Sequence, residues 1–133
     1  MQAVGFVTVL ALVQVMAFQW RVGMARNEFQ IPGPATSGHP TWERYNRVHL
    51  NTIENLVVFL PLLWLCGHLL SPWVATPLGV LFVVARGIYS RAYVADPETR
   101  GKGAWLTSIV LMLLVAGSVA GLVLALARSG AAA

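Results

Sequence analysis

The order of apolar and polar residues along the chain predicts four membrane-spanning helices. Three stretches contain no Lys, Arg, Asp or Glu: Met1–Trp20, Asn55–Ala85 and Gly103–Ala127. A helix needs about 20 apolar residues to cross the hydrocarbon core of a bilayer, so the first and last stretches each supply one crossing. Gly67-His68 and Ser71-Pro72, which are helix-end and turn signals, interrupt the middle stretch. We therefore expect the middle stretch to fold as a helical hairpin.

Neither arm of this hairpin is long enough to cross the membrane by its apolar residues alone. The second arm, Trp73–Ala85, has 13 residues, against the roughly 20 that a crossing requires. Each arm must be completed by its polar end, so charged groups are expected inside one leaflet. The pattern predicts an all-α bundle whose helices cover about residues 2–22, 42–68, 73–94 and 104–127 of a single domain, residues 1–133.

The composition agrees with an integral membrane protein. Of the 133 residues, 57% are hydrophobic and only 11% are charged, and the mean hydropathy is +0.69. A soluble domain carries about 25% charged residues, so a large soluble domain is excluded. The net charge of +4 comes from residues at the ends of apolar runs, without the dense basic stripe of a nucleic-acid-binding protein. We therefore expect no nucleic-acid partner.

The basic residues gather at the first and third connections between the predicted helices. Since positive residues concentrate in cytoplasmic loops, we expect these connections to face the cytoplasm and both termini to lie on the opposite side. An Ala/Val/Leu-rich, Lys-poor composition suggests a bacterial inner membrane. The residues that flank the two connections are Arg21, Arg26, Arg44 and Arg47 for the first, and Arg86, Arg91, Arg100 and Lys102 for the third.

Two polar stripes are predicted on the arms of the hairpin. At about 100° per residue, five polar residues of the second helix fall within roughly a 100° arc, and three of the third helix fall within about 60°. Folding the arms about Leu70 brings Glu54 level with Arg86, each 16 residues away. The stripes therefore lie at the same depth. Their members are Arg44, Arg47, Asn51, Glu54 and Asn55 on the second helix, and Arg86, Tyr89 and Tyr93 on the third.

Two interpretations of these stripes remain open from spacing alone. They form either a structural network that fixes helix packing, with ion pairs such as Glu54 with Arg86, or a polar pocket. Because arginine grips carboxylates bidentately, an excess of arginines and tyrosines favours an anionic ligand. No Ser-His-acid set and no His/Cys group at metal-binding spacing occurs in the sequence. Any reactive atom is therefore expected to arrive with a bound small molecule, and no metal is expected.

Two motifs of the sequence resemble the signatures of the MAPEG family, the membrane-associated proteins in eicosanoid and glutathione metabolism. Residues 42–54, WERYNRVHLNTIE, resemble the family's E-R-x-x-R-x-x-x-N-x-x-E signature on the second helix. Residues 85–93, ARGIYSRAY, are similar to its R-x-x-Y-x-x-x-Y run on the third. The chain length and the proline-rich first connection, Ile31–Pro34, also match. The resemblance covers nearly the whole chain.

This resemblance implies a homotrimer that binds glutathione at the subunit interfaces, near the cytoplasmic side. Arg47, Asn51 and Glu54 would hold its carboxylates and γ-glutamyl amine. Arg86, Tyr89 and Tyr93 would complete the site from the neighbouring subunit. The remaining candidates are His49, at a position where relatives contact glutathione through Gln, Arg26 at the end of the first helix, and Arg100, which would stabilise the thiolate as the catalytic residue.

The implied activity is that of a glutathione transferase or peroxidase that acts on lipophilic electrophiles or lipid hydroperoxides from the bilayer. Asn27 and Asn55 depart from the leukotriene C4 synthase pattern, so a general transferase is preferred to specific leukotriene synthesis. The alternative is a non-catalytic lipid-binding scaffold of the same family. A small proton-coupled exporter is disfavoured, because an arginine-rich cavity repels cationic drugs.

Overall fold

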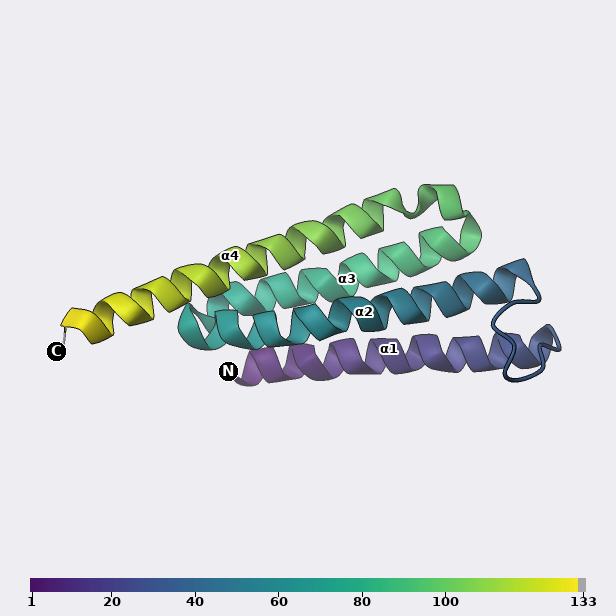
Figure 1. Cartoon of the computed structure of the whole chain (residues 1–133), viewed down its shortest axis with the longest axis horizontal. Helices are drawn as coiled ribbons and strands as arrows, with labels where there is room; N and C mark the ends of the chain where they lie inside the picture. Colours follow the sequence, from purple (N-terminus) through teal and green to yellow (C-terminus); the bar gives the residue numbers. More distant parts are fainter. Residues whose placement is uncertain (132–133) are drawn as a thin grey trace.

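A computed structural model, which describes residues 1–131, shows four long helices in one bundle (Figure 1). All four are long and apolar enough to cross a membrane. The predicted all-α, multi-pass membrane bundle is therefore confirmed. The elements are α1 (Gln2–Glu28), α2 (Pro40–Leu69), α3 (Pro72–Ala95), a short 3-10 helix η1 (Pro97–Arg100) and α4 (Gly101–Ala131).

The helices lie side by side in chain order, so that the connections alternate between the two ends of the bundle. Figure 1 shows the α1–α2 loop and the α3–α4 connection together at one end, and the α2–α3 turn at the other. Helix α2 packs against α1, α3 and α4. We call the first of these ends the basic end, because it carries Arg26, Arg47 and Arg100.

Proline at the first helical position and a side-chain cap define the start of both hairpin helices. Pro40 begins α2, and Nδ1 of His39 accepts the N–H of Thr41 at 3.2 Å. Pro72 begins α3, and Oγ of Ser71 accepts the N–H of Trp73 at 3.1 Å. Proline is favoured there because N–H groups in the first turn have no partner within the helix, so the N–H that proline lacks is not needed. The resulting two-residue turn, 70–71, holds α2 and α3 tightly antiparallel.

The core between the helices is apolar and closely packed. The rings of Phe59 in α2 and Phe82 in α3 are both fully buried and stack with centroids 3.8 Å apart. At the other side of the hairpin, α4 approaches its neighbours through glycines. A Cβ on Gly103 would lie 2.5 Å from the backbone nitrogen of Tyr89, and one on Gly121 would lie 2.6 Å from the carbonyl carbon of Leu69. Only a residue without a side chain fits at these two positions.

Helix α1 continues to Glu28, beyond the end expected near residue 22. A small second core at the basic end supports the additional turns: Ala25, Ile31 and Trp42 are buried together there. The periodicity of the first helix alone does not show this support, because Ile31 and Trp42 come from the loop and from α2.

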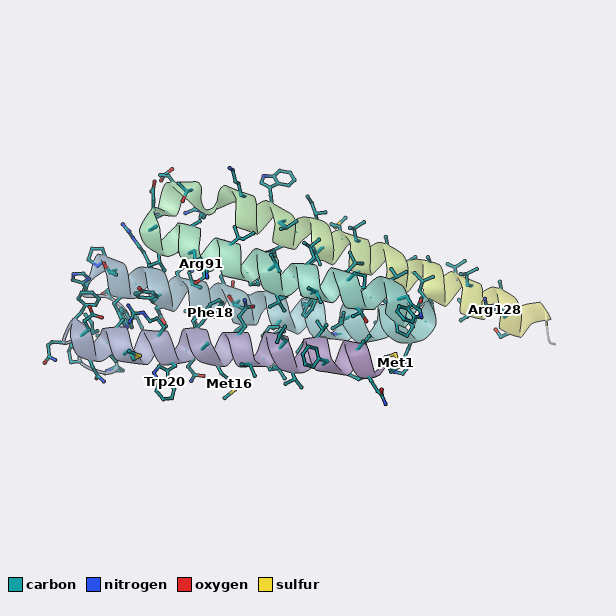
Figure 2. The ribbon with its side chains drawn as sticks, turned by 180° about the vertical axis from the view of Figure 1, so that it is seen from behind. Met1, Met16, Phe18, Trp20, Arg91 and Arg128 are labelled. Atoms are coloured by element: carbon teal, nitrogen blue, oxygen red, sulfur yellow. The ribbon has the colours of Figure 1, made fainter. Side chains whose placement is uncertain are left out.

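The outer faces of the bundle carry large apolar side chains, as expected of surfaces in contact with lipid. Met16 and Trp20 on α1 are 65% and 74% exposed, and both point away from the other helices in Figure 2. Helix α4 also extends past the α2–α3 turn and past the start of α1 (Figure 1). Its exposed apolar residues there include Leu124 and Leu126.

Substituting Gly121 by Ala is expected to destabilise the bundle, because the new methyl group meets backbone atoms of Leu69 and Leu70 that have little freedom to move. Overpacking of this kind costs about 1–3 kcal/mol. Gly130→Ala is the matched control in the same helix, since nothing lies within 4 Å of its Cβ position. Thermal unfolding in detergent should show a lower midpoint for Gly121→Ala and an unchanged or slightly higher one for Gly130→Ala. Equal midpoints would contradict the close packing of α4.

Candidate functional site

A buried arginine joins the two polar stripes of the hairpin. Arg86 of α3 is 1% exposed. Its Nε and Nη2 donate to Oγ1 of Thr52 at 3.3 and 2.8 Å, and Nη2 also donates to Oδ1 of Asn51 at 3.0 Å. The Thr52 hydroxyl in turn donates to the carbonyl of Val48 at 2.7 Å. Arg86 is thus held by neutral oxygens of α2.

These contacts take the place of the ion pair between Arg86 and Glu54 that the structural-network interpretation allowed. Thr52 lies 18 residues from Leu70, whereas Arg86 lies 16 residues away. Two residues of helix correspond to about 3 Å along the axis, so the guanidinium extends past the level of Glu54 toward the basic end. Long basic side chains in membrane helices extend in this way toward the nearer polar boundary. Glu54 stays exposed.

Arginines and tyrosines stack from the buried centre to the basic end. The guanidinium of Arg86 lies 4.2 Å from the ring centroid of Tyr89. The rings of Tyr89 and Tyr93 are 5.6 Å apart and nearly parallel, and the guanidinium of Arg100 lies 5.7 Å from the Tyr93 ring. This stack brings Arg100 from η1 into the same group of side chains as the two tyrosines of α3.

Hydrogen bonds from two directions fix the connection that carries Arg100. Nη1 of Arg44, in α2, donates to the carbonyls of Val94 and Ala95 at 3.1 and 3.4 Å, which satisfies the end of α3. Within the connection, Oδ1 of Asp96 accepts the N–H of Glu98 at 3.1 Å and so caps η1. Arg44 therefore acts on the position of Arg100 through the backbone.

On α2, the side chains around Asn51 are linked to one another. Nδ2 of Asn55 donates to the carbonyl of Asn51 at 2.7 Å and to its Oδ1 at 3.3 Å. Nδ2 of Asn51 points toward Oε2 of Glu54 at 3.5 Å. Arg47, one turn nearer the basic end, is exposed. We call the group formed by these side chains and the arginine–tyrosine stack the polar crevice: Arg47, Asn51, Glu54, Asn55, Arg86, Tyr89, Tyr93 and Arg100.

Two cavities open beside the polar crevice. One of about 180 Å³ is lined by Asn51, Asn55 and Arg86 from the hairpin and by Ala104, Thr107 and Ser108 from α4. The other, of about 260 Å³, lies between the first loop and α2 and is lined by Thr36, Ser37, Glu43, Asn46, Arg47 and Leu50. A larger cavity of about 620 Å³ lies between the start of α1 and the start of α3. No arginine, lysine or carboxylate lines it, so it offers no comparable grip for an anion.

Two of the residues expected in the site lie apart from the polar crevice within the chain. Arg26 supports the first loop: Nη1 donates to the carbonyls of Pro32 and Ala35 at 3.3 and 3.2 Å, and the guanidinium lies 4.5 Å from the Trp42 ring. His49 is half-buried and lies about 160° around α2 from Asn51. Either residue would reach the crevice only from another copy of the chain.

The structure brings Arg86 and Asn51 together within one chain, whereas the resemblance implied that Arg86 completes the site from a neighbouring subunit. The tight two-residue turn is the reason, because it places α3 directly against α2. Sequence reasoning also missed Thr52, Thr107 and Ser108. Thr52 lies about 60° outside the polar arc of α2. In the sequence, only its place next to Asn51 could have pointed to Thr52. Nothing in the sequence pointed to Thr107 and Ser108 of α4.

The fold and the site define the class: a multi-pass helical membrane protein with stacked arginine and tyrosine side chains at one end. The chain belongs to the MAPEG family, whose model matches residues 4–121. The resemblance seen in the two motifs is thereby confirmed.

The chain is similar to several curated proteins over most of their length. It is 36% identical to mouse microsomal glutathione S-transferase 2 over 115 residues, which covers 86% of this chain and 78% of that protein. It is 31% identical to bovine leukotriene C4 synthase over 116 residues, covering 87% and 77%. An uncharacterized protein of Synechocystis is 36% identical over 113 residues, covering 85% and 82%.

Replacing Thr52 by Val should destabilise the protein. Valine has the same shape but lacks the hydroxyl oxygen that accepts two hydrogen bonds from buried Arg86. Leaving a buried donor unsatisfied costs about 1–3 kcal/mol, and more for a charged group. The measurement is the free energy of unfolding by denaturant in detergent. Ser108→Ala, whose exposed hydroxyl bonds back to the carbonyl of Ala104, should change it by less than about 0.5 kcal/mol. If both variants behave alike, Thr52 does not support Arg86.

Proposed function

We propose that the protein is a membrane-embedded glutathione transferase that acts on lipophilic electrophiles or lipid hydroperoxides. The observation that carries the proposal is the polar crevice, in which both family motifs meet within one chain and arginines outnumber carboxylates. The names of the relatives, glutathione transferase and leukotriene C4 synthase, support the same conclusion. Glutathione is the co-substrate in this proposal, and the second substrate enters from the bilayer.

The α2 side of the crevice is suited to the γ-glutamyl end of glutathione. A carboxamide N–H of Asn51 and a carboxylate oxygen of Glu54 lie 3.5 Å apart, so a ligand there must present an acceptor beside a cation. An α-amino acid group does so, because its carboxylate and its ammonium share one carbon. In the proposed arrangement, Arg47 and Asn51 hold this carboxylate and Glu54 holds the ammonium. The cysteinyl part then extends toward Tyr93 and Arg100.

Arg100 would act on the thiol. A nearby cation lowers the pKa of a cysteine thiol from its usual value of about 8.5, and Arg100 lies at the exposed end of the arginine–tyrosine stack. The thiolate then attacks an electrophilic carbon, the new C–S bond forms and the leaving group departs with its electron pair. With a hydroperoxide, the same thiolate attacks the terminal oxygen, the O–O bond breaks and the other oxygen leaves as the alcohol after taking up a proton; a second glutathione then converts the sulfenic acid to the disulfide and water.

We further propose a homotrimer in a bacterial inner membrane, with the basic end in the cytoplasm and both termini on the other side. The positions of His49 and Arg26 support an oligomer, since either would join the crevice only from another copy. Native mass spectrometry of the detergent-extracted protein should show three chains. A monomer that binds glutathione with undiminished affinity would refute the role of these two residues.

Purified protein tests the activity directly. Glutathione should raise the melting temperature of the wild type by mass action, and the protein should turn over chlorodinitrobenzene, a lipid hydroperoxide, or both. Glu54→Gln should weaken the stabilisation by glutathione, because the neutral side chain no longer offsets the ligand ammonium. Saturable glutathione binding without turnover of either substrate would favour the non-catalytic scaffold. Absence of binding would refute the proposal.

The pH dependence of conjugation should depend on Arg100. Arg100→Gln removes the cation beside the bound thiol, so the thiol pKa rises toward its value in water, and less thiolate is present at neutral pH. We expect kcat to fall about tenfold or more at pH 7 and the rate to recover as the pH rises toward 9. Arg91→Gln is the matched control, because Arg91 is exposed on α3. A pH profile that is the same in the wild type and Arg100→Gln would exclude this role.

A further inference from the structure

The orientation of the Asn51 amide follows from its neighbours. Arginine side chains only donate hydrogen bonds, so the Asn51 atom 3.0 Å from Nη2 of Arg86 is the carbonyl oxygen. Nδ2 of Asn55 donates to the same oxygen at 3.3 Å. With its oxygen engaged from two sides, the amide directs its N–H groups toward Glu54 and the exposed side of α2. Asn51 therefore offers a donor to any ligand in the crevice.

Arg86 lines the smaller cavity beside α4, but its burial and its own partners leave little of the guanidinium for a ligand. The side chain is 1% exposed, Nε and Nη2 are directed at Thr52 and Asn51, and the Tyr89 ring covers the guanidinium at 4.2 Å. None of these partners is a carboxylate, so no anion among them competes with the Asn51 oxygen for the guanidinium. Because the hairpin holds Arg86 of α3 against the Asn51 oxygen of α2, it determines which side of the Asn51 amide faces a ligand.

We propose that Arg86 is a positioning residue, not a ligand-binding one, and that it makes the crevice selective for a carboxylate by fixing the Asn51 amide with its N–H outward. The inference rests on the proposed function, in which glutathione is the ligand. It adds a rule for ligand selection: the group that meets Asn51 must be an acceptor, so a carboxylate binds and a carboxamide, which turns a donor toward Asn51, binds less well.

The test compares two ligands by their dissociation constants in detergent. One is glutathione, and the other is glutathione with the α-carboxylate of its γ-glutamyl residue replaced by a primary carboxamide. Wild-type binding of glutathione, measured first, tests the proposed function alone. A hydrogen bond to a charged group contributes about 1.5–3 kcal/mol, so the wild type should prefer glutathione by about tenfold to a hundredfold.

Asn51→Asp should reverse this order. The new carboxylate accepts from Arg86 on one side and presents an acceptor on the other, so it repels the ligand carboxylate and binds the carboxamide N–H. The melting temperature without ligand serves as a folding control, because the anionic partner gained by the buried guanidinium is opposed by repulsion between the new carboxylate and Glu54. The control is Asn46→Asp, which makes the same change of charge beside Arg47 and should keep the wild-type order. Retention of the order in Asn51→Asp, or its reversal in Asn46→Asp, would overturn the inference.

Arg86→Met tests the same role in a variant that is expected to fold, since it leaves no buried charge, and the Thr52 hydroxyl keeps its bond to Val48 and the Asn51 oxygen its bond from Asn55. With the guanidinium gone, only the longer bond from Asn55 holds the Asn51 oxygen, so the amide rotates more easily and the preference between the two ligands should shrink. Glutathione affinity should fall only a few-fold, since Arg47 and Glu54 remain. A loss of more than a hundredfold at a wild-type melting temperature would place Arg86 on the ligand and overturn the inference.

Discussion

A charged group inside a membrane helix bundle costs several kcal/mol unless the protein surrounds it with partners, and Arg86 meets this constraint with neutral oxygens from α2. Thr52 and Asn51 accept its N–H groups, and Tyr89 covers the guanidinium. Because no carboxylate takes part in these contacts, the positive charge remains to attract an anion. The same contacts thus join α2 to α3 and leave the polar crevice with a net positive charge.

The rest of the polar crevice depends on where helices end. Arg44 satisfies the last carbonyls of α3, and Asp96 caps the short helix that carries Arg100. Gly103 lets α4 begin against the backbone of Tyr89, which brings Thr107 and Ser108 to the smaller cavity. Charged side chains are unfavourable in the membrane interior, and the ends of helices need polar partners. Both needs are met at the basic end.

The sequence predicted the hairpin and the common depth of its polar stripes, because the turn signals Gly67-His68 and Ser71-Pro72 interrupt a charge-free stretch of 31 residues. It did not predict Thr52 as the partner of Arg86, since the helical period places that hydroxyl outside the polar arc and only the length of the arginine side chain brings the two together. The task of Arg26 was hidden for another reason. Its partners, the carbonyls of Pro32 and Ala35, belong to a loop whose path no periodicity describes.

The overhang of α4 also affects how the protein sits in its bilayer. The uncharged part of this helix, Gly103–Ala127, has 25 residues and measures about 37 Å at 1.5 Å per residue, whereas the hydrocarbon layer is about 30 Å thick. The hairpin helices stop at Leu69 and Pro72, well short of the tip of α4. Hydrophobic mismatch of this kind is relieved when a helix tilts or when the adjacent lipid layer thickens. We therefore expect membrane thickness to affect the angle at which α4 crosses the hairpin, and with it the contact of Gly103 with Tyr89.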